Sequence, residues 1–242
     1  GLTDTNVAAG VNTVFSVNGA QAILEGSALA LTNSSITGTG TVLNVFESGL
    51  TGTSSLALIA LDSASSINTF RLVTVDGEGS DSGLVLVGPA LAAAASTVTA
   101  SGDLILVGSM GFLGVASALP LVALDNSSLQ ASSLLNVSFG TVEIGGSLLL
   151  AQNSTLQING NPVSVFGGTL ITGSPPLIAL TNSSANFSGN VLVDGESADV
   201  QLGGSLLSVN GRPTPVGTSV TADSLVEVDF ASLTVGGSIL SV

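Results

Sequence analysis

The chain has 242 residues, of which 45% are hydrophobic and only 7% are charged, and its formal net charge is −14. No apolar stretch reaches the roughly 18 to 20 residues that a membrane-spanning helix requires, so a transmembrane segment is not expected. With two basic residues against sixteen acidic ones, the chain cannot neutralise phosphates, which disfavours a nucleic acid or an anionic membrane surface as its partner. The absence of cysteine and histidine excludes disulfides and the usual nucleophilic and transition-metal sites.

A short apolar run followed by a polar turn recurs along the chain. It reads ALALTNSSI at 28–36, LIALDSASSI at 58–67, PLVALDNSSL at 120–129, SLLLAQNSTL at 147–156 and PPLIALTNSS at 175–184. The small residue before each run returns after 28 to 33 residues, at Ser27, Ser55, Gly88, Ala118, Gly146, Pro175, Gly204 and Gly237. A period of this length over the whole chain indicates a solenoid of stacked repeats.

Within each repeat the pattern favours β-strands, because apolar and polar residues alternate over short segments that end in Gly, Asn or Asp. One repeat contains about three predicted strands, for example Ser147–Ala151, Leu156–Asn159 and Val163–Phe166. We therefore predict an all-β, right-handed parallel β-helix of about eight rungs, where a rung is one turn of the solenoid. It forms a single continuous domain over residues 1–242. The eight phenylalanines, about one per rung, are expected to stack in its interior.

The asparagine that ends the repeated apolar run is predicted to form a corner of the solenoid. Asn tolerates the left-handed backbone conformation of tight turns, and stacked Asn side chains can hydrogen-bond along the axis. The equivalent positions are Asn33, Asn126, Asn153 and Asn182, with Ser63 in a weakly aligned copy. Six Asn-x-Ser/Thr sequons are also possible glycosylation sites in an exported protein, namely Asn33, Asn126, Asn136, Asn153, Asn182 and Asn186.

Two acidic turns, VDGEGSD at 75–81 and VDGESAD at 193–199, are the candidates for site chemistry. Their carboxylates are Asp76, Glu78 and Asp81 in the first turn and Asp194, Glu196 and Asp199 in the second. Carboxylate oxygens suit calcium, so each turn is a candidate calcium site, with a solvated acidic loop as the alternative. No other cofactor is expected. Paired carboxylates also serve glycoside hydrolysis, but the chain lacks the Trp, Tyr and Lys that polysaccharide cleavage favours, so we do not expect an enzyme.

The repeated units LVALDNSSL, GGSLLSVNG and LIALTNSSANFSGN resemble the β-strand repeats of large bacterial exoproteins. These are the filamentous-haemagglutinin-like and autotransporter-passenger adhesins, whose right-handed β-helices form stalks and fibres. The resemblance covers the whole chain. It implies a structural or adhesive protein that is extracellular or on the cell surface. Its implied partners are copies of itself, joined end to end, with cell-surface glycans as further candidates.

The ends of the sequence favour the same interpretation. The chain begins at Gly1 without a basic and apolar leader and stops within a repeat, at GGSILSV. We therefore expect that a signal peptide has been removed or that the sequence is part of a longer one. An uncapped solenoid exposes strand edges that another chain can extend, as in a fibre or stalk. The alternative is a β-helical carbohydrate-binding or carbohydrate-active module, such as a tailspike-like domain, which a groove with aligned aromatic and acidic side chains would favour.

Overall fold

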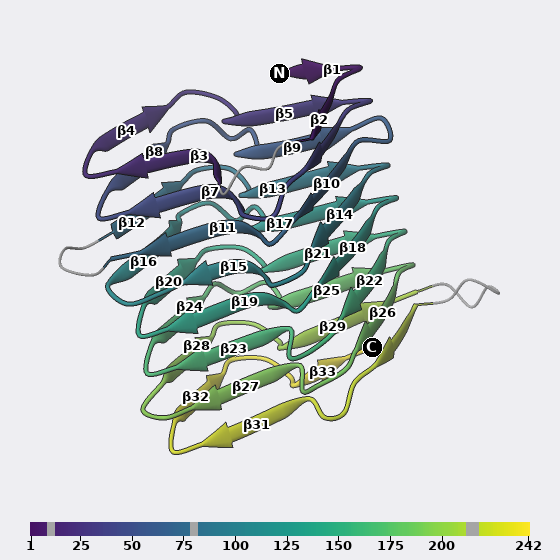
Figure 1. The fold of residues 1–242 in the computed structure, drawn as a ribbon. Coiled ribbons are helices and arrows are strands. Elements are labelled where there is room, and N and C mark those ends of the chain that lie inside the picture. Colours follow the sequence, from purple (N-terminus) through teal and green to yellow (C-terminus); the bar gives the residue numbers. More distant parts are fainter. Residues whose placement is uncertain (9–12, 78–81, 212–217) are drawn as a thin grey trace.

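The computed structural model describes residues 1–8, 13–77, 82–211 and 218–242, and these form β-strands joined by turns. The strands build four parallel sheets, A to D, and successive strands belong to A, B, C and D in turn. Each strand pairs with the strands four positions earlier and later, so one rung consists of four strands. Figure 1 shows the rungs stacked from the N-terminal to the C-terminal end. The predicted parallel β-solenoid of about eight rungs is confirmed.

Sheets A and B meet at the corner that follows the repeated apolar run. Sheet A contains β1 (Leu2–Thr3), β5 (Leu29–Thr32), β9 (Ile59–Asp62), β13 (Leu91–Ala94), β17 (Val122–Asp125), β21 (Leu149–Gln152), β25 (Ile178–Thr181), β29 (Leu207–Asn210) and β33 (Leu240–Ser241). Sheet B contains β2 (Asn6–Ala8), β6 (Ser35–Thr37), β10 (Ser66–Thr69), β14 (Thr97–Ala100), β18 (Ser128–Ala131), β22 (Thr155–Ile158), β26 (Ser184–Phe187) and β30 (Ser219–Thr221).

Sheets C and D complete each rung. Sheet C contains β3 (Thr13–Asn18), β7 (Thr41–Phe46), β11 (Arg71–Asp76), β15 (Asp103–Val107), β19 (Ser133–Ser138), β23 (Val163–Phe166), β27 (Leu192–Gly195) and β31 (Val226–Asp229). Sheet D contains β4 (Gln21–Leu24), β8 (Gly49–Gly52), β12 (Ser82–Leu86), β16 (Gly111–Val115), β20 (Thr141–Ile144), β24 (Thr169–Thr172), β28 (Asp199–Leu202) and β32 (Ser232–Val235). The sequence predicted about three strands per rung. The fourth was missed because glycines such as Gly167, whose φ is 61°, form the corner just before sheet D and resemble an ordinary loop.

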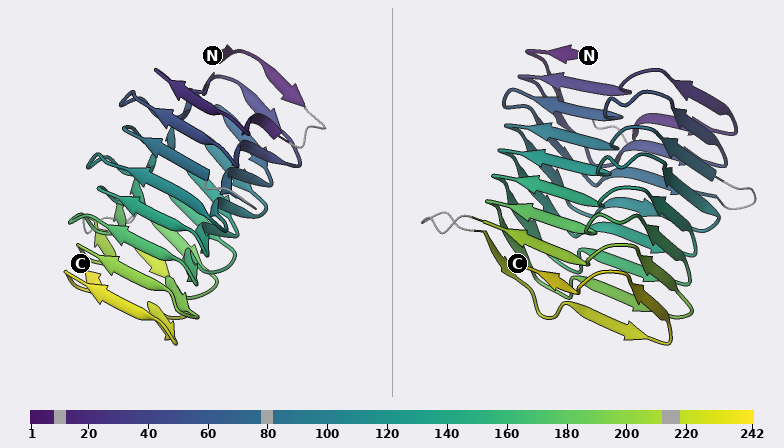
Figure 2. Two further views of the ribbon diagram at one scale, coloured as in Figure 1. Left: turned by 90° about the vertical axis from the view of Figure 1, so that its left-hand side faces the viewer. Right: turned by 180° about the vertical axis from the view of Figure 1, so that it is seen from behind.

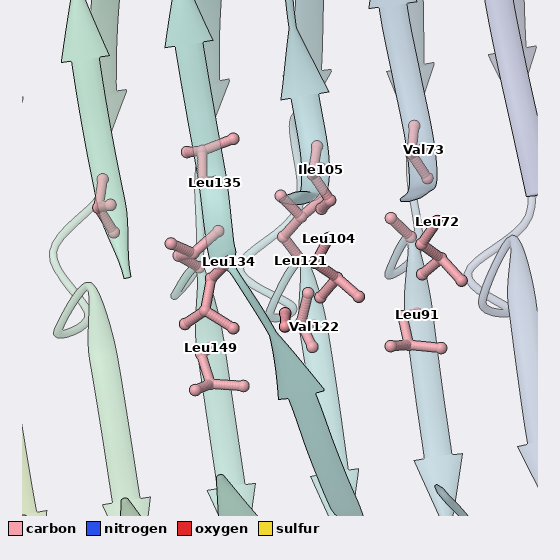
Figure 3. Close-up of a cluster of buried hydrophobic side chains, with 14 of the residues drawn as sticks. Leu72, Val73, Leu91, Leu104, Ile105, Leu121, Val122, Leu134, Leu135 and Leu149 are labelled. Atoms are coloured by element: carbon pink, nitrogen blue, oxygen red, sulfur yellow. The ribbon is translucent and has the colours of Figure 1, made fainter. Parts of the chain in front are cut away.

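The interior is filled by columns of aliphatic side chains that run along the axis. On sheet B, for example, Ile36, Ile67 and Val98 are register partners in successive rungs and are almost fully buried. Figure 3 shows such side chains from neighbouring rungs packed between strands, among them Leu72, Leu91, Leu104, Leu121, Leu134 and Leu149. Burying one large aliphatic side chain contributes about 1.5 to 3 kcal/mol. Stacking therefore supplies the core that a single rung cannot form.

The expected interior stacking of the phenylalanines is wrong. Phe187 is buried, whereas five others are 37% to 88% exposed, namely Phe15, Phe70, Phe139, Phe166 and Phe230. Aliphatic columns already occupy the interior, so most aromatic rings lie outside. There they cover glycines: the ring of Phe139 lies where a side chain on Gly167, in the next rung, would have to be.

Candidate functional site: corners, acidic turns and open ends

The four predicted corner asparagines lie where sheet A turns into sheet B. Asn33, Asn126, Asn153 and Asn182 have φ between 47° and 49°, the left-handed region that Asn tolerates. Their backbone amides donate to carbonyls in the next rung, as Asn126 N does to Gln152 O at 3.1 Å. Their side chains form no Asn-to-Asn hydrogen bond within the described residues, since Nδ2 of Asn126 and Asn153 instead approaches Asp125 Oδ1. The expected asparagine side-chain ladder is therefore not formed.

The serine that follows each corner residue makes a ladder instead. The ladder serines are buried at the same place in six successive rungs: Ser34, Ser65, Ser96, Ser127, Ser154 and Ser183. The amide of Ser96 donates to Ser127 Oγ at 3.1 Å, and that of Ser154 donates to Ser183 Oγ at 3.0 Å. Each Oγ donates in turn to a carbonyl at the end of the preceding sheet A strand. The hydroxyls thus satisfy buried backbone groups both within and between rungs.

The serine ladder has a signal in the sequence that the corner prediction did not use. A serine stands directly after Asn33, Asn126, Asn153 and Asn182. The left-handed corner residue holds its side chain outward, and the chain then turns so that the following side chain faces inward. A short hydroxyl at this inner corner reaches the nearby carbonyls.

The first acidic turn is described only in part. Asp76 is the last residue of β11, and its Oδ1 accepts a hydrogen bond from the Gly77 amide at 3.0 Å. Glu78 and Asp81 lie outside the described residues. Calcium binding at this turn therefore stays a prediction.

The second acidic turn does not bring its three carboxylates together. The Asp194 side chain is fully buried in the core, whereas Glu196 is exposed at the corner. Asp199 lies on the outer face of sheet D, where its Oδ2 accepts a hydrogen bond from Gln201 Nε2 at 2.8 Å. Among the described residues no three acidic, His or Cys side chains gather as a metal site would require. The candidate calcium site at this turn is not assembled.

Asp194 is instead an isolated carboxylate in an apolar column. Its register partners are Val165 in the preceding rung and Val228 in the following one. Neither of its carboxylate oxygens has a hydrogen-bond partner. Burial, and secondarily the nearby Asp199 carboxylate, raises the pKa of Asp194 from 3.8 to about 6. The charged form is therefore disfavoured in the folded state.

The remaining two sequon asparagines lie on strands. Asn136, in β19, is half-buried on the outer face of sheet C, and its Nδ2 donates to Asp103 Oδ2 at 3.4 Å. Asn186, in β26, is exposed, and its Nδ2 donates to Gln157 Oε1 at 3.0 Å. Asn33, Asn126 and Asn153 are exposed at the corner and Asn182 is half-buried. Glycosylation at these six positions stays a prediction.

Both ends of the described solenoid present free strand edges. β1 to β4 are the outermost strands at one end and β30 to β33 at the other. Figure 2 shows the N and C termini at these opposite ends. Val137, Val165 and Val228 belong to one interior column. Val137 and Val165 are fully buried, whereas the side chain of Val228, in β31, is 46% exposed. Leu240, in β33, is 44% exposed. Strand edges and apolar side chains together form a surface on which a further rung fits.

Comparison with protein-family models, with curated proteins and with solved structures finds no match. The resemblance to bacterial exoproteins therefore rests on the repeated units alone. In the ranges that the structure describes, no helix has the length and apolar character needed to cross a membrane.

Proposed function

We propose that the chain is a structural subunit or segment of an extracellular fibre or adhesin stalk, and that it assembles through the open ends of the solenoid. The observation that carries this proposal is the exposure of interior side chains at the last described rung, where Val228 and Leu240 are about half exposed. All four sheets are parallel, so a further rung continues every sheet in the same direction. It extends the hydrogen-bonded ladders and covers these apolar side chains.

The scarcity of basic residues supports a role outside the cell, where proteases act. Trypsin cleaves after Lys and Arg, and the chain has two such residues, Arg71 and Arg212. Arg212 lies outside the described residues. The Arg71 guanidinium lies 4.5 Å from the centroid of the Phe70 ring, and its Nε is 3.5 Å from Asp103 Oδ2. These contacts hold Arg71 against the surface of a regular strand, which a protease active site does not accept readily.

A lysine at the open end tests the proposal. Val228→Lys puts a charge into the stacking surface and is expected to leave the protein as short particles. Val85→Lys is the matched control, because Val85 is 39% exposed on the outer face of sheet D, away from both ends. Sedimentation velocity over a range of concentrations measures the assembly. We expect wild type and Val85→Lys to form longer particles as concentration rises.

Two results would overturn the proposal. One is wild-type protein that stays short at every concentration. The other is assembly that Val85→Lys abolishes and Val228→Lys leaves intact, because association would then occur through the side of the solenoid.

A further inference from the structure

The outer face of sheet B carries two columns of uncharged polar side chains. The first column aligns Asn6, Ser35, Ser66, Thr97, Ser128, Thr155, Ser184 and Ser219 in register. The second aligns Thr37, Asn68, Thr99, Gln130, Gln157, Asn186 and Thr221. Because parallel strands are about 4.8 Å apart, each column offers a hydroxyl or amide group at that interval along the axis.

Sheet B differs from the other sheets in its charge. Its strands contain no Asp, Glu, Lys or Arg. The other outer faces carry carboxylates, including Asp125 on sheet A, Asp103 on sheet C and Glu143 on sheet D. In a chain with a net charge of −14, sheet B is therefore a neutral face between acidic ones. The carboxylates on the neighbouring sheets would repel an anionic ligand. A cationic ligand would bind to those carboxylates rather than to sheet B.

A hollow of about 390 Å³ lies along the edge between sheets A and B. Thr97 and Ser128 of the first polar column form one side, and Asn126 and Asn153 of the corner form the other. The volume lies in the range of small-molecule sites in proteins. Every side chain around the hollow is Ser, Thr, Asn or Ala. It therefore has no aromatic, large apolar or charged group.

Two of the corner residues that line the hollow are alanines rather than asparagines. Ala95 stands before a ladder serine at the place that Asn126 occupies in the next rung. The corner of Ala64 is one residue longer, because Ser63 and Ala64 are both left-handed and precede the ladder serine there. The φ angles of Ala64 and Ala95 are 63° and 47°, a region that alanine tolerates less well than asparagine does. Asparagine would suit the backbone better at both positions, but its side chain is larger than that of alanine. At Ala64 and Ala95 the hollow is therefore bordered by smaller side chains than the backbone conformation favours.

We propose that this hollow and the polar columns of sheet B bind a neutral polysaccharide chain that runs along the solenoid axis. Hydroxyl and amide groups both donate and accept hydrogen bonds, and they match the hydroxyls of neutral sugars. This face offers no cation to pair with a phosphate or carboxylate group, and the acidic faces beside it disfavour anions. The small side chains around the hollow offer no platform for an apolar ligand. The regular interval between rungs lets successive sugar units meet the same kind of group.

The test uses the full chain, produced in a host without N-glycosylation because a new asparagine at position 64 or 95 creates a sequon. Affinity electrophoresis is run in gels that contain mannan, dextran or mixed-linkage β-glucan, with plain and polygalacturonate gels for comparison. The filling variant is Ala64→Asn combined with Ala95→Asn, which suits the left-handed corner. Asn182→Ala is the matched control, since it changes the same kind of corner outside the hollow. Thr97→Val removes one hydroxyl and keeps the strand propensity.

We expect at least one neutral polysaccharide to retard wild type and Asn182→Ala equally. The filling variant and Thr97→Val should each bind about tenfold more weakly, as the loss of one or two hydrogen bonds implies. Three results would overturn the proposal: no retardation by any neutral polysaccharide, undiminished retardation of both site variants, or retardation by polygalacturonate alone. The readout does not require end-to-end assembly, so its outcome is independent of the proposed stalk function.

Discussion

The amide of Ser127 donates a hydrogen bond to the side-chain oxygen of Ser154, 3.1 Å away in the next rung. Both serines are buried, and the Ser127 hydroxyl itself donates to Asp125 O at 2.8 Å. The same kind of hydrogen bond joins Ser34 to Ser65, Ser96 to Ser127 and Ser154 to Ser183. The corner therefore links the rungs through side chains as well as through the strands, and it does so where the sheet ladder is interrupted.

Removing one hydroxyl of this ladder is expected to destabilise the solenoid. Ser127→Ala leaves the buried Ser96 amide without its acceptor, which should lower the free energy of unfolding by about 1 to 3 kcal/mol. Ser128→Ala is the matched control, because Ser128 is half-buried on the outer face and its hydroxyl contacts Thr97 Oγ1 at 3.2 Å. Its effect should be within about 0.5 kcal/mol. Urea denaturation measures both, and equal effects would contradict the role of the ladder.

The aromatic covering of Gly167 predicts a difference between two glycines with the same backbone conformation. Gly167 and Gly19 have φ of 61° and 63°, but only Gly167 has Phe139 against it, while Gly19 has open space. Alanine should cost about 1 to 2 kcal/mol at either position because of φ. At Gly167 it should cost about 1 kcal/mol more, because the ring is displaced.

A double-mutant cycle isolates the contribution of the ring. If Phe139 causes the extra loss, Gly167→Ala should have the same effect as Gly19→Ala once Phe139→Ala is also present. An extra loss at Gly167 that persists without the ring would show that the backbone, and not the aromatic contact, sets the difference.

Asp194 predicts a pH-dependent stability. Its folded pKa of about 6 lies above the ordinary value of 3.8, so the folded state binds the proton more tightly than the unfolded state does. The contribution of Asp194 to the free energy of unfolding is fully present below about pH 4. It is lost as the pH rises through about 6, which lowers the free energy of unfolding by about 3 kcal/mol. Asp194→Val introduces the residue that Val165 and Val228 supply in the neighbouring rungs. This variant should be the more stable protein above pH 6.

The difference between wild type and Asp194→Val is the quantity to measure, because the other carboxylates titrate in both proteins. Thermal unfolding between pH 4 and 8 should show the two curves diverging as the pH rises. Curves that stay parallel over this range would mean that Asp194 is not buried as a lone carboxylate.

Period and alternation were enough to predict the architecture. A spacing of 28 to 33 residues between apolar runs fixes the length of a rung, and short alternating segments fix its strands. They do not determine which side chains face the interior when a segment is apolar throughout. That choice depends on how the strand pairs with the neighbouring rung. In Leu192–Gly195 that pairing turns Asp194 inward, beside Val165. The sequence alone predicts a candidate calcium site or, as the alternative, a solvated acidic loop, and both place Asp194 at the surface.

At the corner, too, the sequence was enough to predict one feature but not another. Left-handed φ angles at Asn126 and its equivalents followed from residue type alone, and the structure has them. The side-chain ladder did not follow, because whether Asn126 or Ser127 faces inward depends on how the chain turns between two sheets. The outside position of Phe139 and Phe166 was missed for a related reason: hydrophobicity predicts burial, but the interior columns were already filled by aliphatic residues.

Electron microscopy with fibre diffraction of the purified wild-type chain at neutral pH tests end-to-end assembly most directly. Assembly through the open ends predicts filaments of uniform width that lengthen with concentration, with a layer line at about 4.8 Å along the filament axis. Short dispersed rods at every concentration, or filaments whose strands run along the axis, would contradict it.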